Sequence, residues 1–278
     1  IYTRIFLISF GCSMVINTEM KTSRLIGIAL FAIVMCVNFA SCSKDTDILT
    51  DNEIITKSKK LIGMKETEGD NTYIWEFSYD SEGKLSSIIY SFDLYGGSNR
   101  QQQVTHYTWR SFTIIAESDY QTRTYTLDEN NLVKTIRSDK ETDWSNAQFS
   151  YNSSNQLLVV DNGTYSNKYT WENDEISKIN SNDSYSNIIY SGKTCKGYFP
   201  LYNYYDDIFY AHPELIGLRN SQLPEREFYK YKDSQREFEY SYVFDKDGYV
   251  ESCTMVRTEK NLSNNSNTST TIFTFKWE

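Results

Sequence analysis

The stretch "YVFDKDGYVESC", Tyr242 to Cys253, repeats the pattern of an earlier stretch, "FSYDSEGKLSSI", which begins at Phe77. Both place an aromatic residue shortly before an Asp, a Gly three positions after that Asp, and two apolar residues at fixed distances beyond the Gly. The copies "YTLDENNLVKTI" from Tyr125 and "FSYNSSNQLLVV" from Phe149 keep the spacing, and "YTWENDEISKI" from Tyr169 has a shorter turn. This recurrence indicates a chain built from one repeated supersecondary unit.

The polar positions of the unit have the chemistry of a tight turn. An Asp or Asn at the first turn position can accept a bond from the backbone two residues on, and Gly or Asn at the fourth tolerates positive φ. This predicts a type I turn closed by a bulge, with no catalytic role for its carboxylates, because Asn can replace Asp. The predicted turn residues are Asp80 and Gly83, Asp128 and Asn131, Asn152 and Asn155, and Asp245 and Gly248.

The flanks of each turn read as strands. From Phe238 to Phe244 every second residue is aromatic, and this period of two is typical of an antiparallel strand with one buried face. After the turn, the three-residue gap from Leu85 to Ile88 breaks the alternation, and we interpret it as a bulge that changes faces. The sequence therefore predicts an all-β antiparallel meander of many short hairpins, forming a barrel or a strongly curved sheet.

The segment "MKTSRLIGIALFAIVMCVNFASC", Met20 to Cys42, has the order of an export signal: cationic residues, an apolar core, then small residues. Its core is short for a transmembrane helix. We expect residues 1–41 to be a leader that is removed, with the true start at Met20. Residues 42–57 then form a polar tether, and 58–278 form a single all-β domain.

The ending "FASC" is similar to a bacterial lipobox, which implies that Cys42 carries lipid and anchors the protein to the outer membrane. The following "SKDTD", from Ser43 to Asp47, resembles the signals that send lipoproteins of Bacteroides-like bacteria to the cell surface. An ordinary polar tether is the alternative. Whether Cys195 and Cys253 pair within the domain stays open at this stage.

A single segment interrupts the repeat. Residues 200–224 contain all three prolines, which cannot donate to a strand ladder, so we expect an insert with a short helix between Asp206 and His212. With the "YD-x-x-G-x-L" hairpins and the lipobox, its "HPELIG…LP" resembles a family of Bacteroides lipoproteins of unknown function. That resemblance, over Ser58 to Glu278, implies a porin-like β-barrel and gives no catalytic residues.

A binding module for a glycan or a small apolar ligand is the leading functional hypothesis. A barrel of more than about eight strands is not filled by its own side chains, so the insert would act as a plug or lid beside a ligand. The candidate ligand-binding residues are Tyr202, Tyr204, Tyr205, Asp206, Asp207, Phe209 and Tyr210. The alternatives are that they pack the insert, that the protein is a structural or protein-interaction surface protein, or that it is an outer-membrane barrel.

Other classes of function have less support. The chain has a net charge of −9 and no compact basic patch, which argues against nucleic-acid binding. Its two histidines, His106 and His212, have no nucleophile motif nearby, so we expect no enzyme activity. "DKDG" lacks the first and last ligands of a calcium loop, which are replaced by Val243 and Thr254, and no other spacing indicates a metal or cofactor.

Overall fold

The computed structural model describes residues 5–9, 12–16, 58–94, 100–140, 146–197, 206–218, 222–232, 234–260 and 266–278 of the chain. The strands β1 (Ile5–Ser9) and β2 (Cys12–Ile16) form a separate two-stranded sheet. Cys42, the tether and the rest of the predicted leader lie outside the described residues, so those predictions remain predictions.

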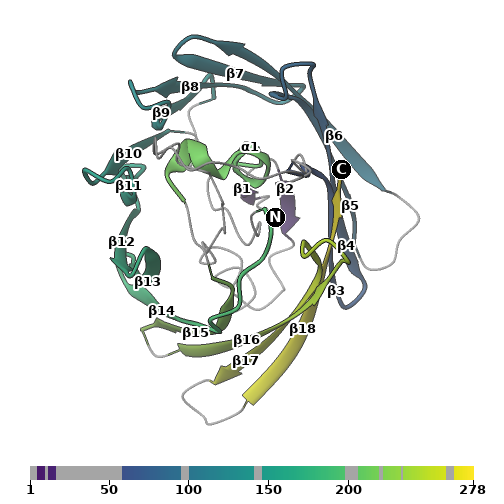
Figure 1. The fold of residues 1–278 in the computed structure, drawn as a ribbon, viewed down its shortest axis with the longest axis vertical. Helices are drawn as coiled ribbons and strands as arrows, with labels where there is room; N and C mark the ends of the chain where they lie inside the picture. The colour runs from purple at the N-terminus through teal and green to yellow at the C-terminus, as the bar shows by residue number, and fades with distance from the viewer. Residues whose placement is uncertain are drawn as a thin grey trace, which may run out of the picture.

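Strands β3 to β18 form a closed antiparallel barrel in which each strand pairs with its neighbours in sequence and β18 pairs with β3 (Figure 1). The predicted all-β meander is confirmed. Of the two predicted forms, a barrel or a strongly curved sheet, the structure has the closed barrel. The strands are β3 (Leu61–Glu68), β4 (Asn71–Tyr79), β5 (Leu85–Asp93), β6 (Gln101–Arg110), β7 (Thr113–Ser118), β8 (Thr122–Leu127), β9 (Val133–Ser138), β10 (Ala147–Tyr151), β11 (Leu157–Asp161), β12 (Ser166–Glu172), β13 (Glu175–Asn180), β14 (Ser184–Tyr190), β15 (Pro224–Tyr231), β16 (Ser234–Phe244), β17 (Val250–Lys260) and β18 (Ser266–Trp277).

The five repeated units all lie at one end of the barrel. They join β4 to β5, β8 to β9, β10 to β11, β12 to β13 and β16 to β17, and in a meander every such even-to-odd connection falls at the same end. We call this the motif end. The insert between β14 and β15 also starts and finishes there. At the closing seam, β18 ends and β3 begins at this end.

The expected bulge is present in the strand after the turn. Between β4 and β5 the register shifts at Tyr79, which faces Leu85, whereas Ser78 faces Ser87. The extra residue brings both Leu85 and Ile88 to the buried face, although they are three positions apart. The same shift follows the turns after β8, β10, β12 and β16.

The two faces of the wall differ in polarity. On β4, Trp75 and Phe77 are buried while Glu76 between them is exposed, and on β18 Phe273 and Phe275 are buried while Thr274 is exposed. Exposed charged residues occur around the barrel: Lys65, Glu76, Glu117, Lys134, Arg137, Lys168, Glu251 and Lys276. The inner face is thus mainly aromatic and aliphatic, and the outer face has exposed charged residues on many strands beside a few exposed apolar ones such as Val243 and Ile272.

The insert contains the helix α1 (Ile208–Ala211) and the 3-10 helix η2 (Pro213–Ile216), as expected for a short helix that stops before Pro213. Figure 1 shows α1 inside the ring of strands. The apolar side chains of both helices, such as Ile208 and Leu215, are buried in the barrel core. Among the described residues, no helix has the length and apolar character needed to cross a membrane.

Candidate functional site

Asp206 anchors the insert to the inside of the wall. Its side chain is 3% exposed, and its Oδ2 accepts hydrogen bonds from the Arg123 guanidinium and the Tyr125 hydroxyl of β8. Burial alone would lower the pKa of Arg123, but the carboxylate of Asp206 outweighs it and raises that pKa. Arg123 therefore stays charged inside the barrel, with Asp206 as its counter-ion.

Asp207 extends this anchor toward β4. Its Oδ1 accepts a hydrogen bond from Trp75 Nε1 at 3.2 Å. Burial, followed by the negative charge of neighbouring Asp206, raises the pKa of the Asp207 carboxyl well above its ordinary value. The adjacent carboxyls thus differ in their contacts, because Asp206 pairs with Arg123 whereas Asp207 accepts a hydrogen bond from Trp75.

The aromatic residues of the insert also face the wall. The Phe209 ring centroid lies 6.2 Å from that of Tyr125 and 6.1 Å from that of Phe149, both in edge-on contacts. Tyr210 contacts Trp75 in the same way at 5.7 Å. Asp206, Asp207, Phe209 and Tyr210 thus have the environment of the packing alternative. Their ligand role stays a prediction, and Tyr202, Tyr204 and Tyr205 lie outside the described residues.

His212 joins the insert to the first repeated turn. Its Nε2 accepts a hydrogen bond from the backbone N–H of Leu85 at 3.2 Å, so Nδ1 carries the proton that faces Glu214 Oε1 at 2.7 Å. The ring lies between Tyr79 and Trp109. Leu85 lies at the bulge, directly before the extra residue Ser86, where the backbone leaves the regular ladder, and His212 supplies a partner for its N–H.

The turn residues have the expected local geometry. Asp80 Oδ1 accepts from the N–H groups of Glu82 and Lys84, each at 2.9 Å, and Gly83 has φ of +83°. Asp128, Asn152 and Asp245 accept equivalent pairs of backbone bonds. The fourth positions have positive φ in each copy: Asn131, Asn155 and Gly248. These side chains are occupied by their own turns.

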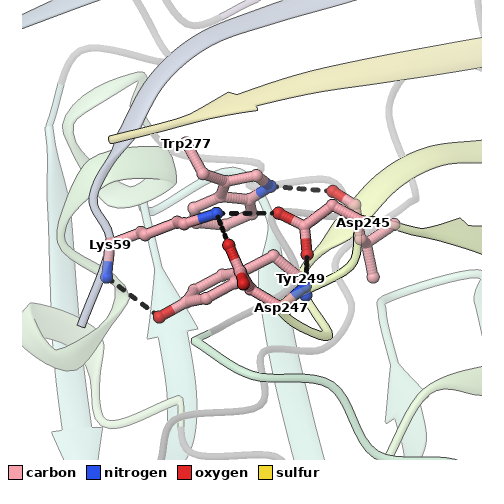
Figure 2. Close-up of polar contacts among 6 residues, drawn as sticks. Lys59, Asp245, Asp247, Tyr249 and Trp277 are labelled. Carbon is pink, nitrogen blue, oxygen red and sulfur yellow. Dashed lines mark hydrogen bonds and ion pairs between the residues drawn. The ribbon is translucent and has the colours of Figure 1, made fainter. Parts of the chain in front are cut away.

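The Asp245 turn also locks the seam of the barrel. Lys59 Nζ lies 2.9 Å from Asp245 Oδ2 and 2.5 Å from Asp247 Oδ2, and Lys59 N–H donates to the Tyr249 hydroxyl (Figure 2). Although burial raises it, the pKa of Asp245 is lowered overall by hydrogen bonds from Lys59 and two backbone N–H groups. A lysine therefore supplies the cation between these carboxylates.

A ring of aromatic hydrogen bonds at the motif end was not predicted from the sequence. A Tyr hydroxyl or Trp N–H near the end of one strand donates to a backbone carbonyl at the start of the preceding strand, at 2.6 to 2.9 Å. Five of the acceptors stand two positions after the positive-φ residue that ends a repeated turn. Within the described residues the pairs are Tyr79 to Leu61, Trp109 to Leu85, Tyr151 to Val133, Trp171 to Leu157, Tyr190 to Ile176, Tyr242 to Pro224 and Trp277 to Val250.

A second polar cluster on the inner wall was also missed. Glu227 of β15 has no exposed surface; the Tyr240 hydroxyl donates to its Oε2, and Oε1 has no hydrogen-bond partner among the described residues. Burial raises the Glu227 pKa to about 7, even though Ser186 and Tyr240 lower it. The period of two in β15 could have revealed it, because Glu227 lies on the same inner face as the aromatic Tyr229 two positions later.

The same wall holds further charged groups beside this carboxyl. The Arg236 guanidinium lies over the Tyr229 ring, 5.6 Å from its centroid, and donates to Glu259 Oε1 at 3.0 Å.

Cys195 and Cys253 are both buried free thiols, which answers the open question of their pairing. No group of three or more His, Cys, Asp or Glu residues could hold a metal ion in the part of the chain that the structure describes.

The comparison with solved structures identifies the architecture. A porin-like protein from Bacteroides uniformis, seen in a crystal structure at 2.32 Å resolution, aligns with a TM-score of 0.58. The alignment covers 80% of this chain and 99% of that one at 15% sequence identity. At this identity the match shows the fold alone. No protein-family model and no curated protein matches the sequence.

Proposed function

We propose that the chain is a lipoprotein of the bacterial cell envelope, anchored to the outer membrane through lipid on Cys42. Its barrel would be a binding module for a glycan or a small apolar ligand, without enzyme activity, cofactor or nucleic-acid partner. The leader motif supports the anchor. The porin-like neighbour is compatible with an envelope location, and the resemblance to Bacteroides lipoproteins agrees with its source.

The polarity of the wall is the observation that carries the proposal. A barrel that spans a bilayer presents an apolar band outward and polar groups inward. Here aromatic residues such as Trp75 and Phe275 face inward, and charged residues such as Glu76 and Lys276 face outward. This favours a barrel surrounded by water over the outer-membrane alternative. A barrel of this many strands also has an interior wider than its wall side chains fill.

The wall at β15 and β16 is the preferred place for a ligand. The described contacts of α1 and η2 bind the insert to the wall between β4 and β10, whereas Glu227, Tyr229 and Tyr240 lie on β15 and β16. Tyrosine rings beside a carboxyl group can contact both the faces and the hydroxyl groups of a sugar ring. An amphipathic ligand would therefore suit this wall.

Native mass spectrometry of residues 44–278, without the leader and the lipid-bearing Cys42 and purified without detergent, tests the proposal. We expect a retained small-molecule mass that is reduced in the Tyr229→Phe and Glu227→Ala variants. Tyr185→Phe is the matched control, because Tyr185 is an exposed tyrosine on the adjacent strand β14. An empty barrel, or equal retention in all variants, would contradict an interior site and favour a structural or protein-interaction role.

A further inference from the structure

A groove crosses the outer face of the barrel where β18, β3 and β4 lie side by side. Its volume is about 1030 Å³. Gly63 of β3 lies at its floor, paired with Lys276 of β18 on one side and Glu76 of β4 on the other. The backbones at Lys276 and Glu76 are two strand spacings apart, roughly 10 Å, and Gly63 places no side chain of its own between them.

The charge of the groove is opposite to that of the whole chain. Four cationic side chains line it, whereas Glu76 and Glu278 are its acidic residues, and the chain as a whole has a net charge of −9. The four cations are Lys60, Lys65, Arg100 and Lys276. A local excess of positive charge on an acidic protein attracts an anion to this part of the wall.

Three of these cations take part in no ion pair among the described residues, whereas Lys60 Nζ lies over the Tyr79 ring, 4.9 Å from its centroid. Among the ion pairs of the described residues, none includes Lys65, Lys276 or Arg100, and all three side chains are exposed. Elsewhere on the outer wall, Arg226 of β15 contacts Glu237 of β16. The groove therefore keeps its positive charges available to a ligand, at the cost of their mutual repulsion.

The fold does not require a glycine at the floor. A Cβ on residue 63 would lie 3.4 Å from Lys276 Cδ and 3.6 Å from the Trp75 carbonyl oxygen, which are ordinary contact distances, and Gly63 is not among the positive-φ residues. Glycine weakens a strand interior and commonly marks the close approach of another molecule. Here the aliphatic part of the Lys276 side chain lies over the buried Gly63, and glycine leaves room above the strand for this lysine and for a ligand beside it.

We propose that this groove binds an anionic oligosaccharide. Because the barrel is closed, β3 and β4 already pair on both sides and cannot accept a peptide as an added strand, so recognition must use side chains. The lysines supply charge for carboxylate or sulfate groups, and Glu76, Ser78 and Thr274 supply partners for sugar hydroxyls. The groove is separate from the interior site and does not depend on it.

Isothermal titration with a galacturonate tetramer tests the proposal, with a sulfated tetrasaccharide as a second anionic probe and a neutral maltotetraose as the uncharged comparison. We expect the anionic probes to bind and their affinity to fall as salt increases, because exposed charges are screened. A double variant, Lys65→Gln with Lys276→Gln, should lose roughly tenfold in affinity, since each exposed ion pair contributes up to about fivefold.

Two further variants separate the groove from general charge. Lys134→Gln with Lys168→Gln removes two exposed lysines outside the groove and should leave the affinity unchanged. Gly63→Thr should block the groove while retaining the melting temperature, because threonine suits a strand. Equal losses in both lysine pairs, binding of the neutral probe with the same affinity, or no binding of either anion would overturn the proposal.

Discussion

Glu227 is a carboxyl group placed where its ionised form is least stable. It is fully buried, and burial raises its pKa from an ordinary 4.5 to about 7. A raised carboxyl pKa means that the unfolded chain loses this proton at lower pH than the folded barrel does. The free energy of unfolding therefore falls as pH rises from about 4.5 to about 7, by about 3 kcal/mol in total.

Replacing Glu227 with Gln should remove this pH dependence. A glutamine can still accept the Tyr240 hydroxyl bond, but it has no charge to bury. We expect Glu227→Gln to raise the free energy of unfolding by about 3 kcal/mol at pH 8 and to have little effect at pH 4, measured by urea denaturation. The exposed Glu251→Gln is the control, and an equal gain at both pH values would contradict the assignment.

At the scale of the element, the buried ion pair between Asp206 and Arg123 is one of the contacts that hold the insert. Asp206→Asn would leave the Arg123 guanidinium buried without its counter-ion, which typically costs about 3–5 kcal/mol. Thermal melting should show a large loss of stability, and proteolysis should cut the insert sooner. Asp183→Asn breaks the exposed pair with Lys232 and should change stability by less than about 1 kcal/mol. Similar losses of stability in the two variants would contradict the assignment of the Asp206–Arg123 pair as an anchor of the insert.

Each hydrogen bond in the ring of aromatic hydrogen bonds at the motif end should contribute a similar small amount to the free energy of unfolding. Tyr79→Phe and Tyr151→Phe each remove one hydroxyl donor to a backbone carbonyl, which costs about 1 kcal/mol. The two sites lie in different parts of the barrel, so the losses should add in the double variant. Chemical denaturation measures this, with the exposed Tyr185→Phe as reference. Strong non-additivity would show that these hydrogen bonds do not stabilise the barrel independently.

At the scale of the whole molecule, local pattern predicted the hairpins but not their closure. The turn chemistry of Asp80 and Gly83 and the gap from Leu85 to Ile88 depend on residues close together in the chain. Both the turn and the bulge could therefore be predicted from the sequence. Pairing of β18 with β3 joins the two ends of the domain, and no local pattern distinguishes that closure from an open curved sheet. The closed barrel became visible only in three dimensions.

The candidate site shows the same division. The insert was recognised from its prolines, and its helix was placed correctly before Pro213. The partners of Asp206 could not be predicted, because Arg123 and Tyr125 are about 80 residues away in sequence and no repeat links them. The groove at Gly63 was not predicted for a similar reason, since its charged residues come from three strands and from Lys60, Arg100 and Glu278 outside them.

The central claim is that this barrel has water outside its wall and an aromatic interior. Sedimentation velocity of residues 44–278, which lack the apolar leader and the lipid-bearing Cys42, in buffer without detergent tests it most directly, because a charged outer wall needs no lipid or detergent cover. The account predicts a single sharp boundary for a compact particle that does not change when detergent is added. Aggregation without detergent, with a single species only in micelles, would contradict it and restore the membrane barrel.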